Sequence, residues 1–568
     1  MAGALLAGAA VTVPLVVVAA GDYQLPVDRV SDWADAGLAT IGGVPSANWP
    51  VCNATPLLPT GSPGGDTAEI NAMIAACAAG TVVQLGPGKF EMGVNQFVLV
   101  NKGVVLRGAG VDPVTGAQLT TLDNPRNYQA TLTQQNNNDP WPIVILGPGI
   151  WVNPDGDARC SGLTAYQPQY MQLLSADGAQ GSSSVTVADG GIFHPGMYVL
   201  LDQTSGAKWM PDVTAPAVGA TPQGRVWASP DYAVQWDLHD PAQLYVDDPL
   251  ALVTPSAADN YAATGNGTDA GCWFSRQDRP QNEIKQIASV TGDTVTFTSP
   301  LTMGYQTAQH AELTTFTGSN QTVERAGVED LAVTGGGNNA VMFNNTAYSW
   351  AKNIEVTDWY GAGVAFNDSF RDDLIDSYVH DGAWSEPGGA GYAISISEAS
   401  SELLIQNNIS MGVNKVMVAR SSGAGSVVAY NYMDDGFIAT TEAWIEAGVN
   451  GSHMVGAHSM LFEGNQSFNA ESDDTHGNST YMTFFRNYLT TVRAPFVNPF
   501  TGDAVDDATQ AANGPKRAIS AGTYSYWMSY VGNVLGIPGV TTAANGYSSE
   551  STDWTTDRTT MWMLGWNP

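Results

Sequence analysis

Residues 380–476 are the part of this sequence densest in side chains whose types and spacing could support acid–base chemistry. Four of the seven histidines fall in this stretch, together with the carboxyl groups of Asp381, Asp434 and Asp435. Two carboxyl groups about 6.5–9.5 Å apart can hydrolyse a glycosidic bond with inversion, one as general acid and the other as the base that activates water. The sequence therefore predicts Asp434 or Asp435 as a base and Asp381 or His380 as an acid.

Side chains that could hold a substrate surround these candidates. Tryptophan rings offer apolar faces to sugar rings, and histidine and arginine can donate hydrogen bonds to hydroxyl groups. The predicted substrate-binding residues are Trp384, Lys415, Arg420, Glu442, Trp444, His458, His476 and Arg486.

A lyase reaction is the alternative chemistry for this region. Lys415 or Arg420 would then be the base that removes a proton from a uronate whose charge Ca²⁺ neutralises. Both residues could instead simply offset the surrounding acids. Ca²⁺ is the one cofactor considered, and no cysteine–histidine spacing predicts a metal site.

A short phrase that ends in asparagine recurs through the second half of the chain and indicates the scaffold. Successive copies end at Asn408, Asn431, Asn465, Asn487 and Asn533; the first and third steps are 23 and 22 residues, and the last step of 46 equals two periods of 23. A fixed period in the twenties with one apolar strand per copy is typical of a solenoid, where side-chain amides can stack in a column. Weaker copies extend the column upstream through Ser377, Asn353 and Asp330.

Two steps of this repeat are too long, and they locate a predicted cleft. Ser377 to Asn408 is 31 positions and Asn431 to Asn465 is 34. Both insertions follow the repeated residue at the same place in the turn, so we expect two loops on one side of the solenoid. Strand spacing puts them about 10 Å apart. The candidate acids and bases lie in these loops.

The N-terminal region carries a resemblance to a known superfamily. Residues 65–77 predict a helix with Asp66 or Thr67 as its cap, and the segments GTVVQLGPGKF (80–90) and VVLRGAG (104–110) follow it. Together they resemble the start of right-handed parallel β-helix proteins of the pectate-lyase-like superfamily, in which the helix covers the open end of the solenoid. With the repeats, the fold class is all-β: a right-handed parallel β-helix with an N-terminal capping helix and a lateral β insertion.

A second, shorter resemblance concerns the candidate site. The segment MDDGFI (433–438) resembles the Asp-Asp motif of polygalacturonase-type β-helix hydrolases, and His476-Gly477 resembles the His-Gly pair of that family. The Asn-Thr-Asp and Arg-x-Lys motifs of those enzymes are missing here, and Arg486 is the only basic residue near the right place. No specific enzyme family is therefore assigned.

The chain divides into six predicted segments. Strand-like runs and a predicted hairpin (Ile284–Val290 with Thr294–Phe297) indicate that the period is broken by an excursion. The segments are an apolar leader (1–20), an entry strap (21–65), the capping helix with the first turns (66–200), a lateral aromatic-rich insertion (201–283), the main β-helix (284–540) and a C-terminal cap (541–568).

Composition bounds the partners and the location. The formal charge of −33 argues against nucleic acid and anionic membranes as partners. Residues 1–20 are typical of a secretory leader, although a membrane anchor is the alternative. The four cysteines, at 52, 77, 160 and 272, predict two disulfides, with Cys52–Cys77 tying the strap to the helix.

These observations predict an exported or cell-surface protein whose partner is a polysaccharide. The favoured function is a carbohydrate-active enzyme, a hydrolase or a lyase. The alternative is a non-catalytic surface protein such as a spike, adhesin or array component, which would form a homotrimer or self-assemble.

Overall fold

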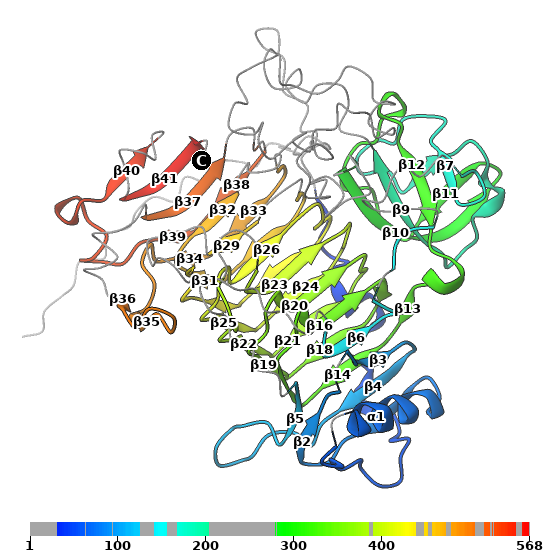
Figure 1. Cartoon of the computed structure of the whole chain (residues 1–568). Coiled ribbons are helices and arrows are strands. Elements are labelled where there is room, and N and C mark those ends of the chain that lie inside the picture. The colour runs from blue at the N-terminus through cyan, green and yellow to red at the C-terminus, as the bar shows by residue number, and fades with distance from the viewer. Residues whose placement is uncertain are drawn as a thin grey trace, which may run out of the picture.

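Three long parallel sheets run the length of the protein. The computed structural model describes residues 31–566 except 63, 94, 125–140, 151, 156–166, 204–278, 280, 386–389, 439–447, 452–456, 473–478, 506–515, 523–524, 526 and 552–558. Within a turn of the solenoid, consecutive strands belong to different sheets, and each pairs in parallel with its equivalent one turn later. The chain is a right-handed parallel β-helix, as the sequence predicts (Figure 1).

Each sheet contributes one strand to nearly every turn. The first sheet comprises β1 (Thr81–Gln84), β4 (Val104–Arg107), β14 (Gly327–Glu329), β18 (Trp350–Lys352), β21 (Asp373–Ile375), β24 (Leu404–Gln406), β27 (Val427–Ala429), β30 (Leu461–Glu463), β33 (Thr483–Phe485) and β38 (Ser529–Val531). The second comprises β2 (Gly88–Glu91), β5 (Thr120–Asp123), β15 (Ala332–Thr334), β19 (Glu355–Thr357), β22 (Tyr378–His380), β25 (Ile409–Met411), β28 (Tyr432–Met433), β31 (Gln466–Ser467), β34 (Tyr488–Leu489) and β39 (Val534–Leu535). The third comprises β3 (Val98–Val100), β6 (Val144–Leu146), β16 (Asn339–Asn344), β20 (Ala362–Asn367), β23 (Tyr392–Ser397), β26 (Met417–Ala419), β29 (Val449–Asn450), β32 (Ala470–Ser472), β37 (Lys516–Gly522), β41 (Thr559–Trp566) and β40 (Ser548–Ser551).

The interior of the solenoid is a continuous apolar column. Valine, isoleucine, leucine and phenylalanine side chains from all three sheets point inward and are almost completely buried. Identical or similar residues stack on successive turns, as in Phe343 on Phe366 at 4.4 Å and Phe462 on Phe484 at 4.7 Å between ring centroids. Since each turn packs only on its neighbours, the chain can be long without needing one large globular core.

The repeated asparagines form a hydrogen-bonded column at the corner between the first and second sheets. The Asn408 backbone N–H and side-chain amide both donate to Oδ1 of Asn431, at 2.9 and 3.0 Å. The same pair of bonds joins Asn431 to Asn465, Asn465 to Asn487, and Asn487 to Asn533. Ser377 begins the column, because its N–H donates to Asn408 Oδ1 at 3.0 Å. The predicted stacking of these amides is confirmed.

Two details of the predicted column were wrong. Asn353 and Asp330 lie one position earlier, in the neighbouring corner column, where the Asn353 amide donates to Asp330 at 2.7 Å; the Ser377 hydroxyl instead accepts from Ile354 N–H. The step of 46 from Asn487 to Asn533 is a single turn, because the two residues are hydrogen-bonded directly. That turn contains a third insertion, which the sequence period concealed.

The column makes a testable contribution to stability. We expect Asn431→Ala to lower the free energy of unfolding by about 3 kcal/mol, because it leaves buried donors on Asn408 and the carbonyl of Ile405 unpaired. Asn533→Ala, on the last and half-buried rung, should cost less than half as much. Urea unfolding of both variants would measure this; equal losses would contradict a column whose interior rungs matter most.

The N-terminal helix covers one end of the solenoid. Helix α1 (Gly65–Ala76) buries Ile70 and Ile74 against the first turns, and the side chain of Asn71 bonds to the Phe97 carbonyl and the Leu99 N–H beside β3. The predicted Cys52–Cys77 disulfide is present. The other two cysteines, at 160 and 272, lie outside the described residues.

A small antiparallel sheet stands beside the solenoid (Figure 1). Its six strands, in sheet order, are β7 (Met171–Leu173), β12 (Glu312–Thr315), β9 (Tyr198–Gln203), β10 (Gln281–Thr291), β11 (Thr294–Phe297) and β8 (Ser184–Thr186). The predicted hairpin corresponds to β10 and β11. A bridge between Leu174 and Val187 brings the two edges together around a separate apolar core. The strands span 171–315, so this unit reaches beyond both ends of the predicted 201–283 insertion.

The outer faces of the three sheets differ in what covers them. The entry strap runs along the first sheet. The Trp33 indole N–H donates to the Ser459 carbonyl, and the Leu38 N–H donates to the Asp373 carboxyl group. Further along, Val51 forms a parallel β-bridge with Val82. Every residue of β23, in the third sheet, is buried. The second sheet is open, because residues of β19, β22, β25, β28, β31 and β34 alternate between buried and partly or fully exposed.

No helix in the described part of the chain is long and apolar enough to cross a membrane. The apolar leader, 1–20, is not among the described residues.

Candidate functional site

Three insertions leave the solenoid at the same corner, between the second and third sheets. The first (381–391) joins β22 to β23, and the second (434–448) joins β28 to β29. The third (490–515) joins β34 to β37 and was not predicted. The two overlong steps of the repeat therefore do project from one side.

The described part of the third insertion packs over the second. Phe496 and Phe500 contact the ring of Phe437, at 5.3 and 6.1 Å between centroids. Phe500 also meets Trp384 of the first insertion edge to face at 4.9 Å. The predicted cleft is thus partly filled by chain, and a hairpin of β35 (Phe496–Val497) with β36 (Ala504–Val505) holds the covering segment.

Asp434 is anchored by its surroundings. Its carboxyl group is buried and accepts hydrogen bonds from the Asp435 N–H, the Tyr432 hydroxyl and the Ala494 N–H, at 2.8, 3.1 and 3.1 Å. Burial still raises the pKa of Asp434, although these bonds oppose the shift. A carboxyl group with this many fixed donors is suited to holding the third insertion in place rather than to exchanging protons.

Among the predicted catalytic residues, Asp435 is a buried carboxyl group with one oxygen atom left unpaired by the described residues. The residue is 6% exposed, and its Oδ1 has no hydrogen-bond partner among the described residues. Burial, reinforced by the charges of Asp434 and Asp381, raises the pKa of Asp435 to about 7. A carboxyl group that holds its proton near neutral pH can act as a general acid.

Asp381 and Asp435 lie in one column of the corner, with one turn between them. Strand pairing aligns His380 with Met411 and Ser410 with Met433, so Asp381, Gly412 and Asp435 occupy one column. A Cβ atom placed on Gly412 would lie 2.7 Å from Asp381 Oδ1. The Asp381 carboxyl group therefore lies directly above this glycine. Two rungs separate the backbones by about 10 Å, and the Asp381 charge is near enough to contribute to the raised pKa of Asp435.

His380 orients Asp381. Its Nδ1 lies 2.8 Å from Asp381 Oδ2 and its Nε2 lies 3.3 Å from Glu355 Oε1, while its ring stacks on Tyr378 at 3.6 Å. The Asp381 side chain is 76% exposed. The exposed carboxyl group and the buried one therefore differ in solvation, which is the condition for separate acid and base roles.

The remaining predicted residues are distributed over several places. Trp384 is at the site, and Arg420 lies on the third sheet, where it donates to Ser395 and stands over the Tyr392 ring. Lys415 is buried just before β26. Glu442, Trp444 and His476 lie outside the described residues.

Two predicted substrate-binding residues are placed away from the carboxyl pair. His458 is fully buried, where Nε2 lies 2.9 Å from the Asn282 carbonyl oxygen of the lateral sheet, and burial lowers its pKa. It holds the lateral unit against the solenoid. Arg486 is exposed at the corner between the first and second sheets, over the Phe485 ring.

Arg493, in the third insertion, acts electrostatically on both Asp434 and Asp435, and sequence reasoning missed it. Its guanidinium donates to the Gly436 carbonyl at 2.6 Å, lies between the Phe468 and Phe496 rings, and opposes the upward pKa shifts of Asp434 and Asp435. An arginine held between two rings is a common anchor. Only recognition of the third insertion would have identified it.

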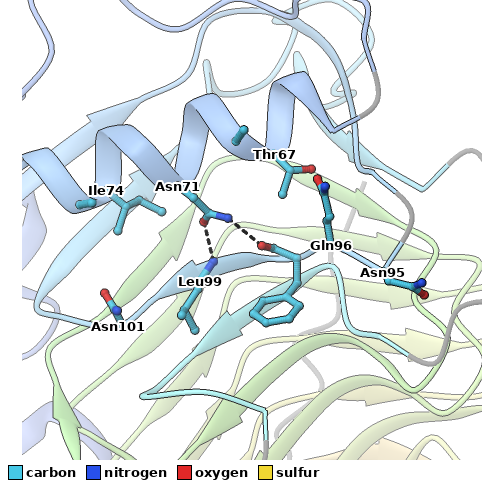
Figure 2. Close-up of a pocket in the computed structure, with 10 residues that line it drawn as sticks. Thr67, Asn71, Ile74, Asn95, Gln96, Leu99 and Asn101 are labelled. Carbon is cyan, nitrogen blue, oxygen red and sulfur yellow. Dashed lines mark hydrogen bonds between the residues drawn. The ribbon is translucent and has the colours of Figure 1, made fainter. Parts of the chain in front are cut away.

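A pocket of about 480 Å³ lies between α1 and β3 at the capped end of the solenoid (Figure 2). Its polar lining consists of amide and hydroxyl groups such as Asn71, Asn95, Gln96 and Asn101, so it offers no acid or base. Across the described ranges, no group of three or more His, Cys, Asp or Glu side chains is arranged to hold a metal ion, and no Ca²⁺ site is assigned.

Comparisons with known proteins concern the fold. No protein-family model matches the sequence, and no curated protein matches it. Among solved structures, the chain is similar to the tailspike protein gp49 from Pseudomonas phage LKA1 (TM-score 0.40, 10% identity, covering 88% of this chain and 69% of that one). It is also similar to the A-module of the mannuronan C-5 epimerase AlgE4 from Azotobacter vinelandii (0.34, 9%, 88% and 91%) and to DFA-IIIase from Arthrobacter chlorophenolicus A6 (0.34, 11%, 87% and 84%). At these identities, no residue role passes to this chain.

Proposed function

We propose that this protein hydrolyses a polysaccharide at the corner formed by Asp381, Gly412 and Asp435. The observation that carries the proposal is the pair of aligned carboxyl groups in contrasting environments, one buried with a raised pKa and one exposed. Their placement, two rungs apart with a glycine between them, fits the separation that inverting glycoside hydrolysis requires.

The roles are the reverse of those the sequence predicts. Asp435, protonated near neutral pH, would donate a proton to the glycosidic oxygen as the bond breaks. Asp381, held by His380, would remove a proton from the water that attacks the sugar carbon from the opposite side. Substrate would approach Asp435 across Gly412, because the third insertion covers the other side.

The pH dependence of the reaction follows from the acid role. Because the pKa of Asp435 is raised from 3.8 to about 7, its protonated fraction falls as the pH rises through 7. We expect kcat/KM to fall about tenfold per pH unit above this point. A flat profile between pH 6 and 9 would rule out Asp435 as the acid.

The same shift has a consequence for stability. A carboxyl group whose pKa is raised by folding binds more protons when folded, so the protein loses stability as the pH rises from about 4 to about 7. In Asp435→Asn this loss should be reduced, which thermal unfolding at pH 5 and pH 8 would show.

A panel of glycans separates hydrolysis from its competitors. New reducing ends indicate a hydrolase, absorbance from an unsaturated product indicates a lyase, and the panel is run with and without Ca²⁺. The second candidate function is that of a non-catalytic surface protein, and the packing of the third insertion over the site favours it. In that case no product would form from any glycan. Export and self-assembly into a trimer or larger array stay predictions.

A further inference from the structure

A column of tyrosines runs along the open second sheet beside the carboxyl pair. Strand pairing aligns Tyr378 with Ile409, Ile409 with Tyr432, Tyr432 with Gln466, and Gln466 with Tyr488. The three tyrosines therefore occupy alternate rungs, roughly 10 Å apart. All three are partly exposed, and Ile409 between them is 42% exposed.

The tyrosine column is continuous with the candidate site. The Tyr432 hydroxyl donates to Asp434, and Tyr378 stacks on His380, which contacts Asp381. The 13° angle between the Tyr378 and His380 rings shows that they stand on the sheet as parallel plates. A sugar ring could stack on the face of Tyr378 opposite to His380, as aromatic faces and apolar sugar faces do.

The charges near the column restrict the ligand. Glu355 lies one rung before Tyr378 in the same column, and Asp376 and Asp381 flank Tyr378, in a chain with a formal charge of −33. Arg486, near Tyr488, is positively charged, as is Lys89, which lies four rungs before Tyr378 in the same column and pairs with Asp123. Such surroundings repel a polyanionic glycan and leave an uncharged one unaffected.

We propose that Tyr378, Tyr432 and Tyr488 form a binding track for an extended, uncharged polysaccharide that lies parallel to the solenoid axis. The inference rests on the proposed function, since the track would deliver the chain to Asp381 and Asp435. It specifies the substrate class and the direction in which the polymer lies.

The track is tested by binding rather than by turnover. The probes are uncharged hexasaccharides (cello-, chito-, laminari- and mannohexaose) and hexagalacturonate, titrated calorimetrically against the full chain in an Asp435→Asn background. We expect at least one uncharged probe to bind, and Tyr488→Ala to weaken that binding roughly five- to tenfold. Ile409→Glu, which places a carboxylate on the track, should weaken it at least as much. Tyr170→Ala, a partly exposed tyrosine of the lateral unit, is the matched control and should have no effect.

The outcomes distinguish the track from the proposed reaction. Unchanged binding in Tyr488→Ala and Ile409→Glu would overturn the track, as would binding of hexagalacturonate alone or of no probe. Binding that depends on Tyr488, without cleavage by the unsubstituted chain, would overturn the hydrolase and leave the track in place.

Discussion

Asp435→Asn is expected to lower kcat by about 10²–10⁴-fold, the range that a single general acid contributes. The amide matches the carboxyl group in size, but its N–H protons are not acidic enough to be transferred at neutral pH. The leaving oxygen must therefore depart unprotonated. Asp435 Oδ1 has no hydrogen-bond partner among the described residues. Replacing this oxygen should therefore cost no hydrogen bond there. The measurement is reducing-end release under saturating substrate.

Asp376→Asn is the matched control. Asp376 has a positive φ, as Asp435 has, but unlike Asp435 it is exposed, and it stands at the corner between the first and second sheets. The activity of Asp376→Asn should equal that of the unsubstituted chain. The variant Asp381→Asn should also lose activity. Added azide, a small external nucleophile, should restore part of the rate in Asp381→Asn and not in Asp435→Asn. Full activity in Asp435→Asn would refute the assignment.

Lys285→Ala is expected to have the largest effect on stability, about 3–5 kcal/mol. Lys285 is completely buried between the lateral sheet and the solenoid, with its ammonium group 2.9 Å from both Glu283 and Glu402. Burial alone would lower its pKa, but the two carboxylates outweigh that effect and raise it. Arg371 extends the cluster by pairing with Glu402 and with Asp35 of the entry strap. Three segments of the chain therefore share one buried charge network.

Removing the Lys285 ammonium group leaves the buried carboxylates of Glu283 and Glu402 without the positive charge that both of them pair with. The control is Lys89→Ala, which removes the ion pair to Asp123 at 2.6 Å from a lysine that is 57% exposed; its expected cost is below about 1 kcal/mol. Urea unfolding followed by tryptophan fluorescence compares the two. Similar losses in both variants would contradict a buried network that joins the lateral unit to the solenoid.

The fold could be predicted because its signal is periodic. Stacked turns require one small hydrogen-bonding residue at the same corner, and Asn408, Asn431, Asn465 and Asn487 record that requirement in their spacing. The same regularity revealed the first two insertions as excess length. The third insertion was missed because its turn is 46 residues long, which equals two ordinary turns, and spacing alone cannot distinguish these cases.

The candidate site was predicted only in part, because burial decides chemistry and cannot be read from residue types. Asp381 and Asp435 were predicted from the insertions, and the proposed exchange of their roles rests on the burial of Asp435 and the exposure of Asp381. His458 looked like a site residue from its position near other acids, yet it is enclosed against Asn282. Arg493 carries no motif and becomes visible only through its contacts.

A crystal structure of Asp435→Asn with a bound uncharged hexasaccharide tests the proposed reaction most directly. We expect one glycosidic oxygen beside residue 435, the anomeric carbon between it and Asp381, and sugar rings continuing past Tyr432 and Tyr488 along the second sheet. A hexasaccharide bound elsewhere, against the third sheet or in the pocket under α1, would contradict it.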